Sequence, residues 1–168
     1  VRLHDRGIEP IVLEADELSD QQMQAIAAWT GVPETTFVLR AQDSRADYRL
    51  RIFNPRYELP FAGHPTIGSA HAALEAGLVG KREDMLVQEC KVGLVELPLS
   101  GKASGGAQRR IGLRMPPASC TRLPEQGERD LEAALGEPLH GTAYIIDVGP
   151  ARLSVPLASG SRVRDLGP

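Results

Sequence analysis

Four consecutive residues, Gly63-His64-Pro65-Thr66, combine side chains that could hold a small anion and move a proton. They stand at the start of a run of small residues, which predicts a helix over residues 66–77 with Pro65 in the first helical position and His64 at the cap. The N–H groups and positive dipole end of a helix start favour a carboxylate, and a glycine lets a ligand approach the backbone. We therefore expect Gly63, Pro65 and Thr66 to bind a small carboxylate and His64 to add a hydrogen bond or a proton. The plainer alternative, that His64 caps and Pro65 starts a buried helix, stays open.

Glu34 is the second candidate for chemistry. It lies between Pro33 and the β-forming run Thr35-Thr36-Phe37-Val38. A carboxylate partly removed from water at the mouth of a strand is suited to act as an acid or a base near neutral pH. The alternative is a solvated loop residue, or one that hydrogen-bonds to the turn after Gly31.

Composition and spacing argue against several other classes of function. His4, His71 and His140 lack metal-ligand spacing, and Cys90 and Cys120 lie far apart, as free thiols do. A net charge of −3 gives little attraction for nucleic acid. Neither a membrane-spanning run nor a signal peptide is recognisable, so we expect a cytoplasmic protein with a small-molecule partner, no nucleic acid and no membrane.

The hydrophobic pattern predicts the elements that must position these residues. A capping box, Ser19-x-x-Gln22, predicts a helix that ends at Gly31, and another short helix is expected over 129–135. Strands are predicted at 8–14, 35–39, 47–53, 85–89, 92–97, 110–115, 143–148 and 152–157. A hairpin loop is expected over 100–106, and the tail from residue 158 has no periodicity.

Several strands around one helix of small residues indicate an α+β fold, in which a curled sheet wraps a central helix. Pro116-Pro117 ends the first β-rich block, and the boundary between two domains is expected near residues 116–127.

Three segments closely resemble the PhzF-like (phenazine biosynthesis) isomerase family. They are Glu34-Thr35-Thr36-Phe37-Val38, Arg51-Ile52-Phe53-Asn54-Pro55, and the stretch from Glu58 to Ala70. The resemblance is good over residues 10–100 and looser over 140–157. It implies a diaminopimelate-epimerase-like fold of two similar domains, each a β-barrel around a central helix, with the active site in the cleft between them. Residues 1–118 would be the N-terminal domain, and 119–168 a linker and the start of an incomplete second domain.

The resemblance also implies a function. The residue matched by Glu34 is the acid/base of a cofactor-independent isomerase that moves a proton on a small carboxylate-bearing substrate, and the one matched by His64 holds or polarises the substrate. Epimerases of this fold have a cysteine where Gly63-His64 stands here, which argues against a two-thiol mechanism.

Two departures from the family pattern qualify these expectations. Ile8-Glu9-Pro10 replaces a Gly-Asn-Pro turn, and the second domain's helix start has no counterpart before Pro168. We therefore expect a fragment or half-enzyme, which forms a homodimer or pairs with a complementing C-terminal segment. The alternative is a non-catalytic binding or scaffold protein that retains only the first domain of the fold.

Overall fold

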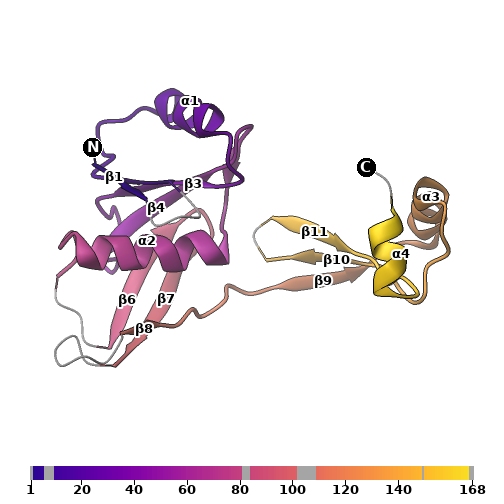
Figure 1. Cartoon of the computed structure of the whole chain (residues 1–168). Coiled ribbons are helices and arrows are strands. Elements are labelled where there is room, and N and C mark those ends of the chain that lie inside the picture. The colour runs from indigo at the N-terminus through magenta and orange to yellow at the C-terminus, as the bar shows by residue number, and fades with distance from the viewer. Residues whose placement is uncertain (1, 6–9, 81–83, 102–108, 149, 167–168) are drawn as a thin grey trace. The chain divides into compact units, whose positions relative to one another are not determined.

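The computed structural model describes residues 2–5, 10–80, 84–101, 109–148 and 150–166, with the side chains of 2–5 excepted. The chain divides into two compact units, Val1–Pro116 and Pro117–Pro168 (Figure 1). Each unit has its own sheet. Residues 8 and 9 of the expected 8–14 strand and most of the expected 100–106 loop lie outside the described residues.

Unit 1 is built on an eight-stranded sheet in the order β1-β2-β3-β4-β6-β7-β8, with β5 paired to β4. Neighbouring strands are antiparallel except for the β2/β3 and β4/β6 pairs, which are parallel. The strands are β1 (Arg2–Asp5), β2 (Pro10–Leu13), β3 (Thr35–Leu39), β4 (Tyr48–Phe53), β5 (Glu58–Leu59), β6 (Met85–Cys90), β7 (Gly93–Ser100) and β8 (Arg110–Ile111).

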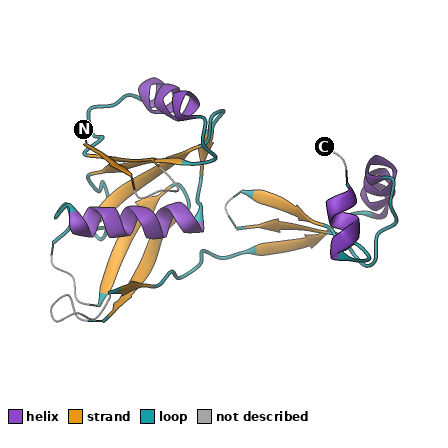
Figure 2. Ribbon diagram, viewed as in Figure 1, coloured by secondary structure: helices purple, strands orange, loops and turns teal. Residues whose placement is uncertain are grey.

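Helix α2 (Gly63–Glu75) crosses one face of this sheet (Figure 2). The helix buries mostly small side chains, at Pro65, Thr66, Ser69, Ala70, Ala72 and Ala73. The sheet supplies larger side chains to the hydrophobic core that it forms with α2, including Leu50, Ile52, Leu86 and Leu97. Gly77, in the left-handed region at φ 70°, ends the helical segment, and Leu78 N–H donates to the carbonyl of Ala73 at 3.0 Å.

Helix α1 (Asp20–Thr30) packs on the opposite face of the sheet. Alternate residues of each strand point to opposite faces, so Val38 and Ile52 contact α2 whereas Phe37 and Phe53 belong to the α1 side. The rings of Phe37 and Phe53 meet edge to face, with centroids 5.5 Å apart. Trp29, near the end of α1, is 84% exposed.

The strand and helix predictions for unit 1 are confirmed in type, except that the strand predicted over 110–115 is limited to Arg110–Ile111, and the α+β class is confirmed. Ser19 Oγ accepts from Gln22 N–H at 3.3 Å, Gln22 Oε1 accepts from Ser19 N–H at 2.9 Å, and Gly31 adopts φ 67°. The β3/β4 pairing is also present. Strand β1 was not predicted.

The predicted start of α2 was wrong. The helix begins at Gly63, with Ala62 as its N-cap, so His64 and Pro65 are its second and third residues. Proline fits anywhere in the first turn, because the N–H groups there have no carbonyl partner within the helix. A proline therefore marks the first turn of a helix without specifying the position.

Unit 2 has a three-stranded antiparallel sheet in the order β11-β10-β9. Its strands are β9 (Ser119–Arg122), which was not predicted, β10 (Tyr144–Asp147) and β11 (Ala151–Ser154). Helix α3 (Glu125–Leu135) starts earlier than expected. The tail contains a further short helix, α4 (Gly160–Asp165), which the sequence did not predict; Ser159 caps it, and Arg162 forms an ion pair with Glu137.

Enlarging the buried face of α2 should destabilise unit 1. Ala73 is 0% exposed, so Ala73→Leu should lower the free energy of unfolding by about 1–3 kcal/mol through overpacking. Urea denaturation measures the change. Ala25→Leu, at an exposed position of α1, is the matched control and should change stability by less than about 0.5 kcal/mol. Equal losses in both variants would show that the face of α2 is not closely packed.

Candidate functional site

The first turn of α2 holds four of the five residues that the sequence singled out. His64 is exposed, Gly63 is half-buried, and Pro65 and Thr66 are buried. Ala62, the N-cap, is extended and offers no side-chain hydrogen bond to the helix start, while Thr66 N–H donates to the Ala62 carbonyl at 3.2 Å. Such a turn presents its positive dipole end without a side-chain cap.

Gly63 also has a packing role. A Cβ atom at this position would lie 3.4 Å from Cδ2 of Leu113, which follows β8. The absence of a side chain therefore lets the start of α2 lie close to the chain beyond β8.

Glu34 occupies the short connection between α1 and β3 and is half-buried. The hydroxyl groups of Thr30 and Thr35, on either side of this connection, are 2.9 Å apart. This contact joins the end of α1 to the start of β3, so the backbone that carries Glu34 is held at both ends.

The register of the sheet relates Glu34 to the segment that leads into α2. Thr35 pairs with Phe53, and Phe53 pairs with Glu58, so β3 and β5 both begin at the carboxyl end of β4. The chain leaves β5 at Leu59, and α2 starts four residues later.

Two further hydrogen bonds join α2 to the sheet. Ser69 Oγ donates to Thr36 Oγ1 of β3 at 2.9 Å, and Gln88 Nε2 of β6 donates to Thr66 Oγ1 at 3.2 Å. The Thr66 hydroxyl therefore contacts the interior of unit 1, and the expectation that Thr66 and Pro65 touch a substrate stays a prediction.

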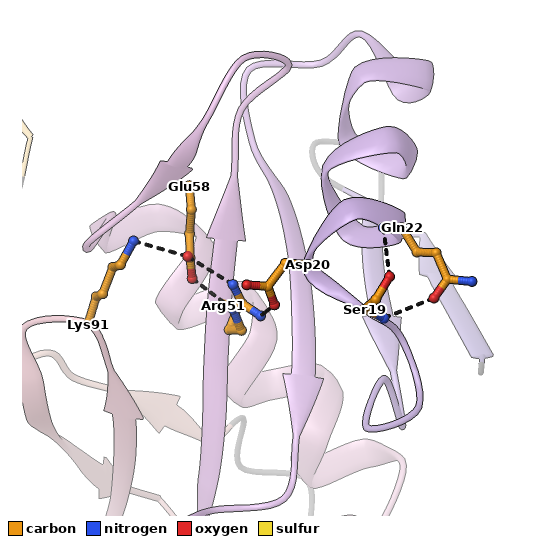
Figure 3. A network of polar contacts seen from close by, with 6 residues as sticks. All are labelled: Ser19, Asp20, Gln22, Arg51, Glu58 and Lys91. Carbon is orange, nitrogen blue, oxygen red and sulfur yellow. Dashed lines mark hydrogen bonds and ion pairs between the residues drawn. The ribbon is translucent and has the colours of Figure 1, made fainter.

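An ion-pair network centred on Arg51 joins β4, β5 and the start of α1 (Figure 3). Arg51 of β4 binds Glu58 of β5 with two hydrogen bonds, Nε to Oε1 at 2.8 Å and Nη2 to Oε2 at 2.9 Å. The same guanidinium binds Asp20 in the first turn of α1, and Lys91 Nζ donates to Glu58 Oε2 at 3.1 Å. The guanidinium carbon of Arg51 also lies 5.1 Å from the centre of the Phe53 ring. Arg51 thus connects α1 with the β4/β5 hairpin, and Glu58 extends the network to Lys91 in the turn between β6 and β7.

The network changes the acidity of its carboxyl groups. Burial alone would raise the pKa of Glu58, but the hydrogen bonds from Arg51 and Lys91 outweigh it and hold that pKa below its ordinary value of 4.5. The hydrogen bond from Arg51 likewise lowers the pKa of Asp20. Both carboxylates are therefore ionised in the neutral range, as the ion pairs require.

Neither of two hollows on unit 1 includes Glu34 or His64 in its lining. A hollow of about 650 Å³ near the end of β3 and the loop after α2 is lined by Glu14, Asp16, Glu17 and Asp47, with Arg40 as its basic residue. Its acidic lining disfavours a carboxylate. The other, about 430 Å³, lies beside Arg51 and is lined by both signs of charge.

Other kinds of site find little support in the part of the chain that the structure describes. No group of three His, Cys, Asp or Glu side chains there could hold a metal ion. Cys90 is half-buried and Cys120 exposed, and both are free thiols. Among the described residues, no helix is long and apolar enough to cross a membrane.

The contacts of Arg51 and Gln88 with neighbouring elements were not predicted from the sequence. The alternation of Arg49 and Arg51 with apolar residues indicated a strand but not a partner for either charge. A hint was available in Glu58, since the turn after β4 brings an acidic residue back across from the basic strand.

The family model described as phenazine biosynthesis-like protein, PhzC-PhzF, matches residues 10–168. Antisense-enhancing sequence 1 of Schizosaccharomyces pombe is 40% identical over 163 residues, which cover 94% of this chain and 54% of that protein. Trans-2,3-dihydro-3-hydroxyanthranilate isomerase of Pseudomonas aeruginosa is 35% identical over 161 residues, again 94% and 54% of the two chains. The chain thus spans about half the length of these curated relatives.

Solved structures agree with the predicted fold. A PhzF-family phenazine biosynthesis protein of Bacillus anthracis matches with a TM-score of 0.72 and 27% identity, over 95% of this chain and 53% of that one. A hydroxyproline epimerase from Agrobacterium vitis matches with a TM-score of 0.58 at 20% identity, over 82% of this chain and 40% of the other, and shares the fold alone. The epimerase-like fold prediction is confirmed.

The Arg51–Glu58 pair should make stability depend on pH. Because the folded-state pKa of Glu58 is lowered, its contribution is complete above pH 4.5 and is lost as pH falls through the folded pKa. Glu58→Gln should lower the free energy of unfolding by about 2 kcal/mol at pH 7, and by progressively less toward pH 3. Urea denaturation across this range measures it.

Glu96→Gln is the matched control, because Glu96 is ion-paired to Arg114 at a more exposed site. It should cost less than about 1 kcal/mol at any pH. A difference between wild type and Glu58→Gln that stays constant from pH 7 to pH 3 would contradict the assignment.

Proposed function

Because this chain belongs to the phenazine biosynthesis-like (PhzC-PhzF) family, we propose that it acts as a cofactor-independent isomerase that moves a proton on a small carboxylate-bearing substrate. The observation that carries the proposal is the 35% identity, over 94% of the chain, to an isomerase whose substrate is by name a carboxylate. The positions of Glu34 and of the α2 start are compatible with this reaction.

In the proposed reaction Glu34 acts as the base and then as the acid. Its carboxylate takes a proton from a substrate carbon, leaving an anion whose charge spreads into the adjoining unsaturated system. The protonated Glu34, whose carboxyl proton can exchange with water, then delivers a proton to a different carbon of that system, so no oxidant, reductant or cofactor is consumed. Glu34 is half-buried, and the contact between the Thr30 and Thr35 hydroxyl groups holds the ends of the connection that carries it.

The start of α2 would hold the substrate carboxylate. The dipole and backbone of the first turn attract an anion, and the exposed His64 side chain can donate a hydrogen bond to it. Gly63, the first helical residue, would let the ligand approach the backbone of this turn closely.

We propose that a second half completes the site, supplied by another copy of the chain or by a complementing C-terminal segment. The chain spans about half of its relatives, and we interpret unit 1 as the family's N-terminal domain and unit 2 as a linker and the beginning of a second. Covering the site would exclude water and strengthen the electrostatic interactions with the substrate. The relatives named as isomerases favour this proposal over a non-catalytic scaffold.

Replacing the proposed acid/base should abolish proton transfer without unfolding the protein. Glu34→Gln keeps the shape of the side chain but removes the carboxyl group that takes up and releases the proton, so turnover should fall by about a hundredfold or more. Transfer is measured by mass spectrometry, as deuterium uptake from heavy water into trans-2,3-dihydro-3-hydroxyanthranilate and other small carboxylates. Glu17→Gln, at an exposed acidic residue, is the control and should retain turnover.

Each protein is assayed alone and mixed with the C-terminal half of the Pseudomonas aeruginosa isomerase. The two halves of that isomerase, expressed separately, serve as the positive control. Isomerase activity that survives in Glu34→Gln would refute the role of this residue. Lack of turnover in every mixture, beside an active positive control, would instead favour the scaffold.

Assembly gives a separate test. The strands of unit 2 expose apolar side chains at Tyr144, Ile145 and Leu153, and β11 is at the edge of its sheet. Exposed strand edges and apolar patches favour association. The purified chain should therefore have a mass above the 18.1 kDa monomer by light scattering, and Leu153→Asp should shift it toward the monomer.

Val163→Asp is the control, because Val163 is an exposed apolar residue of α4 and not of the sheet. A sharp monomer mass at high concentration, with residues 140–157 resistant to proteolysis, would contradict the proposed association.

A further inference from the structure

The side chain of Thr66 faces away from solvent and meets a chain of buried polar groups. Thr66 and Gln88 are each 0% exposed, and Gln88 Nε2 donates to Thr66 Oγ1 at 3.2 Å. Tyr48 OH donates to Gln88 Oε1 at 2.9 Å. The three side chains link β4, β6 and the first turn of α2 in one series.

Tyr48 determines which end of the Gln88 amide reaches α2. Burial raises the pKa of the Tyr48 hydroxyl, so the phenol keeps its proton throughout the neutral range. It therefore donates to the amide oxygen, and the amide N–H group remains directed to Thr66. With the amide reversed, the buried Tyr48 hydroxyl would lose this acceptor for its proton, which is costly, so the observed arrangement of the amide is favoured.

A second buried bond holds the same helix to another strand. Ser69 and Thr36 are also 0% exposed, and their hydroxyl oxygens are 2.9 Å apart. Thr36 follows Glu34 by two residues, just as Thr66 follows His64 by two. Each of the two proposed site residues is thus next to a buried polar contact between α2 and the sheet.

The apolar contacts of α2 restrain its position weakly by themselves. Its buried apolar residues include Ala70, Ala72 and Ala73, whose short side chains form a smooth surface with few ridges. A smooth helix can rotate or slide with a small loss of contact, whereas a hydrogen bond is lost within a fraction of an ångström. Directional polar bonds are the feature of this interface that specifies one register.

We propose that Thr66 and Gln88 are positioning residues, whose hydrogen bond fixes the first turn of α2, and with it Gly63 and His64, against the sheet that carries Glu34. The contact between Ser69 and Thr36 fixes the same helix to β3. This assigns the Thr66 hydroxyl a role other than contact with substrate. The inference rests on the proposed function for its consequence in catalysis, but the geometry can be tested separately.

The test compares Thr66→Val, which removes the hydroxyl at equal size, with Thr66→Ser, which retains it. In NMR spectra of the full chain, Thr66→Val should shift the amide signals of Gly63 and His64 more than those of α1. The amide proton of residue 66, which bonds to the Ala62 carbonyl, should exchange with solvent about tenfold faster. Thr66→Ser should leave both close to wild type, and Gln88→Met should reproduce the effect of Thr66→Val.

Unchanged NMR signals and unchanged amide exchange in Thr66→Val would overturn the proposal. Equal changes in Thr66→Ser would also overturn it, because they would show that side-chain volume, and not the hydrogen bond, positions the helix start. Should Thr66→Val fail to fold, Tyr48→Phe decides in its place. It frees the Gln88 amide with little change in volume and should shift the same signals by a smaller amount. No shift there would also overturn the proposal.

Turnover is measured in parallel on the same proteins. If the wild type transfers protons, Thr66→Val should lower kcat about tenfold or more while changing KM less, because the reacting groups are misplaced and not removed. Wild-type kcat in a Thr66→Val protein whose signals have shifted would overturn the catalytic part. A wild type without turnover counts against the proposed function, and the NMR comparison still decides the positioning.

Discussion

The sheet of unit 1 lies close to α2 because that helix contributes hardly any large side chain to the contact. With Ala70, Ala72 and Ala73 fully buried, the volume between helix and sheet is filled from the sheet, chiefly by Leu50, Ile52, Leu86 and Leu97. Small residues permit this close approach, and close approach brings backbone and short hydroxyl side chains of the helix within hydrogen-bonding reach of the strands. The polar contacts of Thr66 and Ser69 depend on it.

The two faces of the sheet are stabilised in different ways. On the α2 face, neutral hydroxyl and amide groups are buried together with their hydrogen-bond partners, and these directional bonds fix how the helix lies on the strands. On the α1 face, aromatic packing of Phe37 against Phe53 is combined with the ion pairs of Arg51 at the margin, where Asp20 is exposed to solvent. Glu34 lies in the connection between α1, on one face, and β3, which also bonds to α2 on the other face through Thr36.

The features that could be predicted from the sequence are those set by residues close together along the chain. The Ser19–Gln22 capping box and Gly31 defined α1 to the residue, and alternation along 48–52 identified a strand and its buried face. The start of α2 was misplaced, because proline is acceptable at any first-turn position. Helix α4 was missed because six residues are too few for a periodic pattern. The partners of Gln88 were not predictable, since they depend on which distant segments become neighbours in space, whereas Glu58, the partner of Arg51, lies only seven residues away across the β4/β5 turn.

The parallel pairing of β4 with β6 has a consequence for the order in which the molecule forms. Tyr48 and Gln88 are 40 residues apart, and the hairpin with β5 and the whole of α2 lie between them. Contacts of such long range require the closure of a large loop before any stabilisation is gained, so they form slowly and late. During synthesis from the N-terminus, α1, β3 and β4 can assemble first, whereas the first turn of α2 acquires its buried partner only after β6 has emerged from the ribosome. Glu34, the proposed acid/base, is thus synthesised early, and the bond proposed to position the helix start is among the last to form.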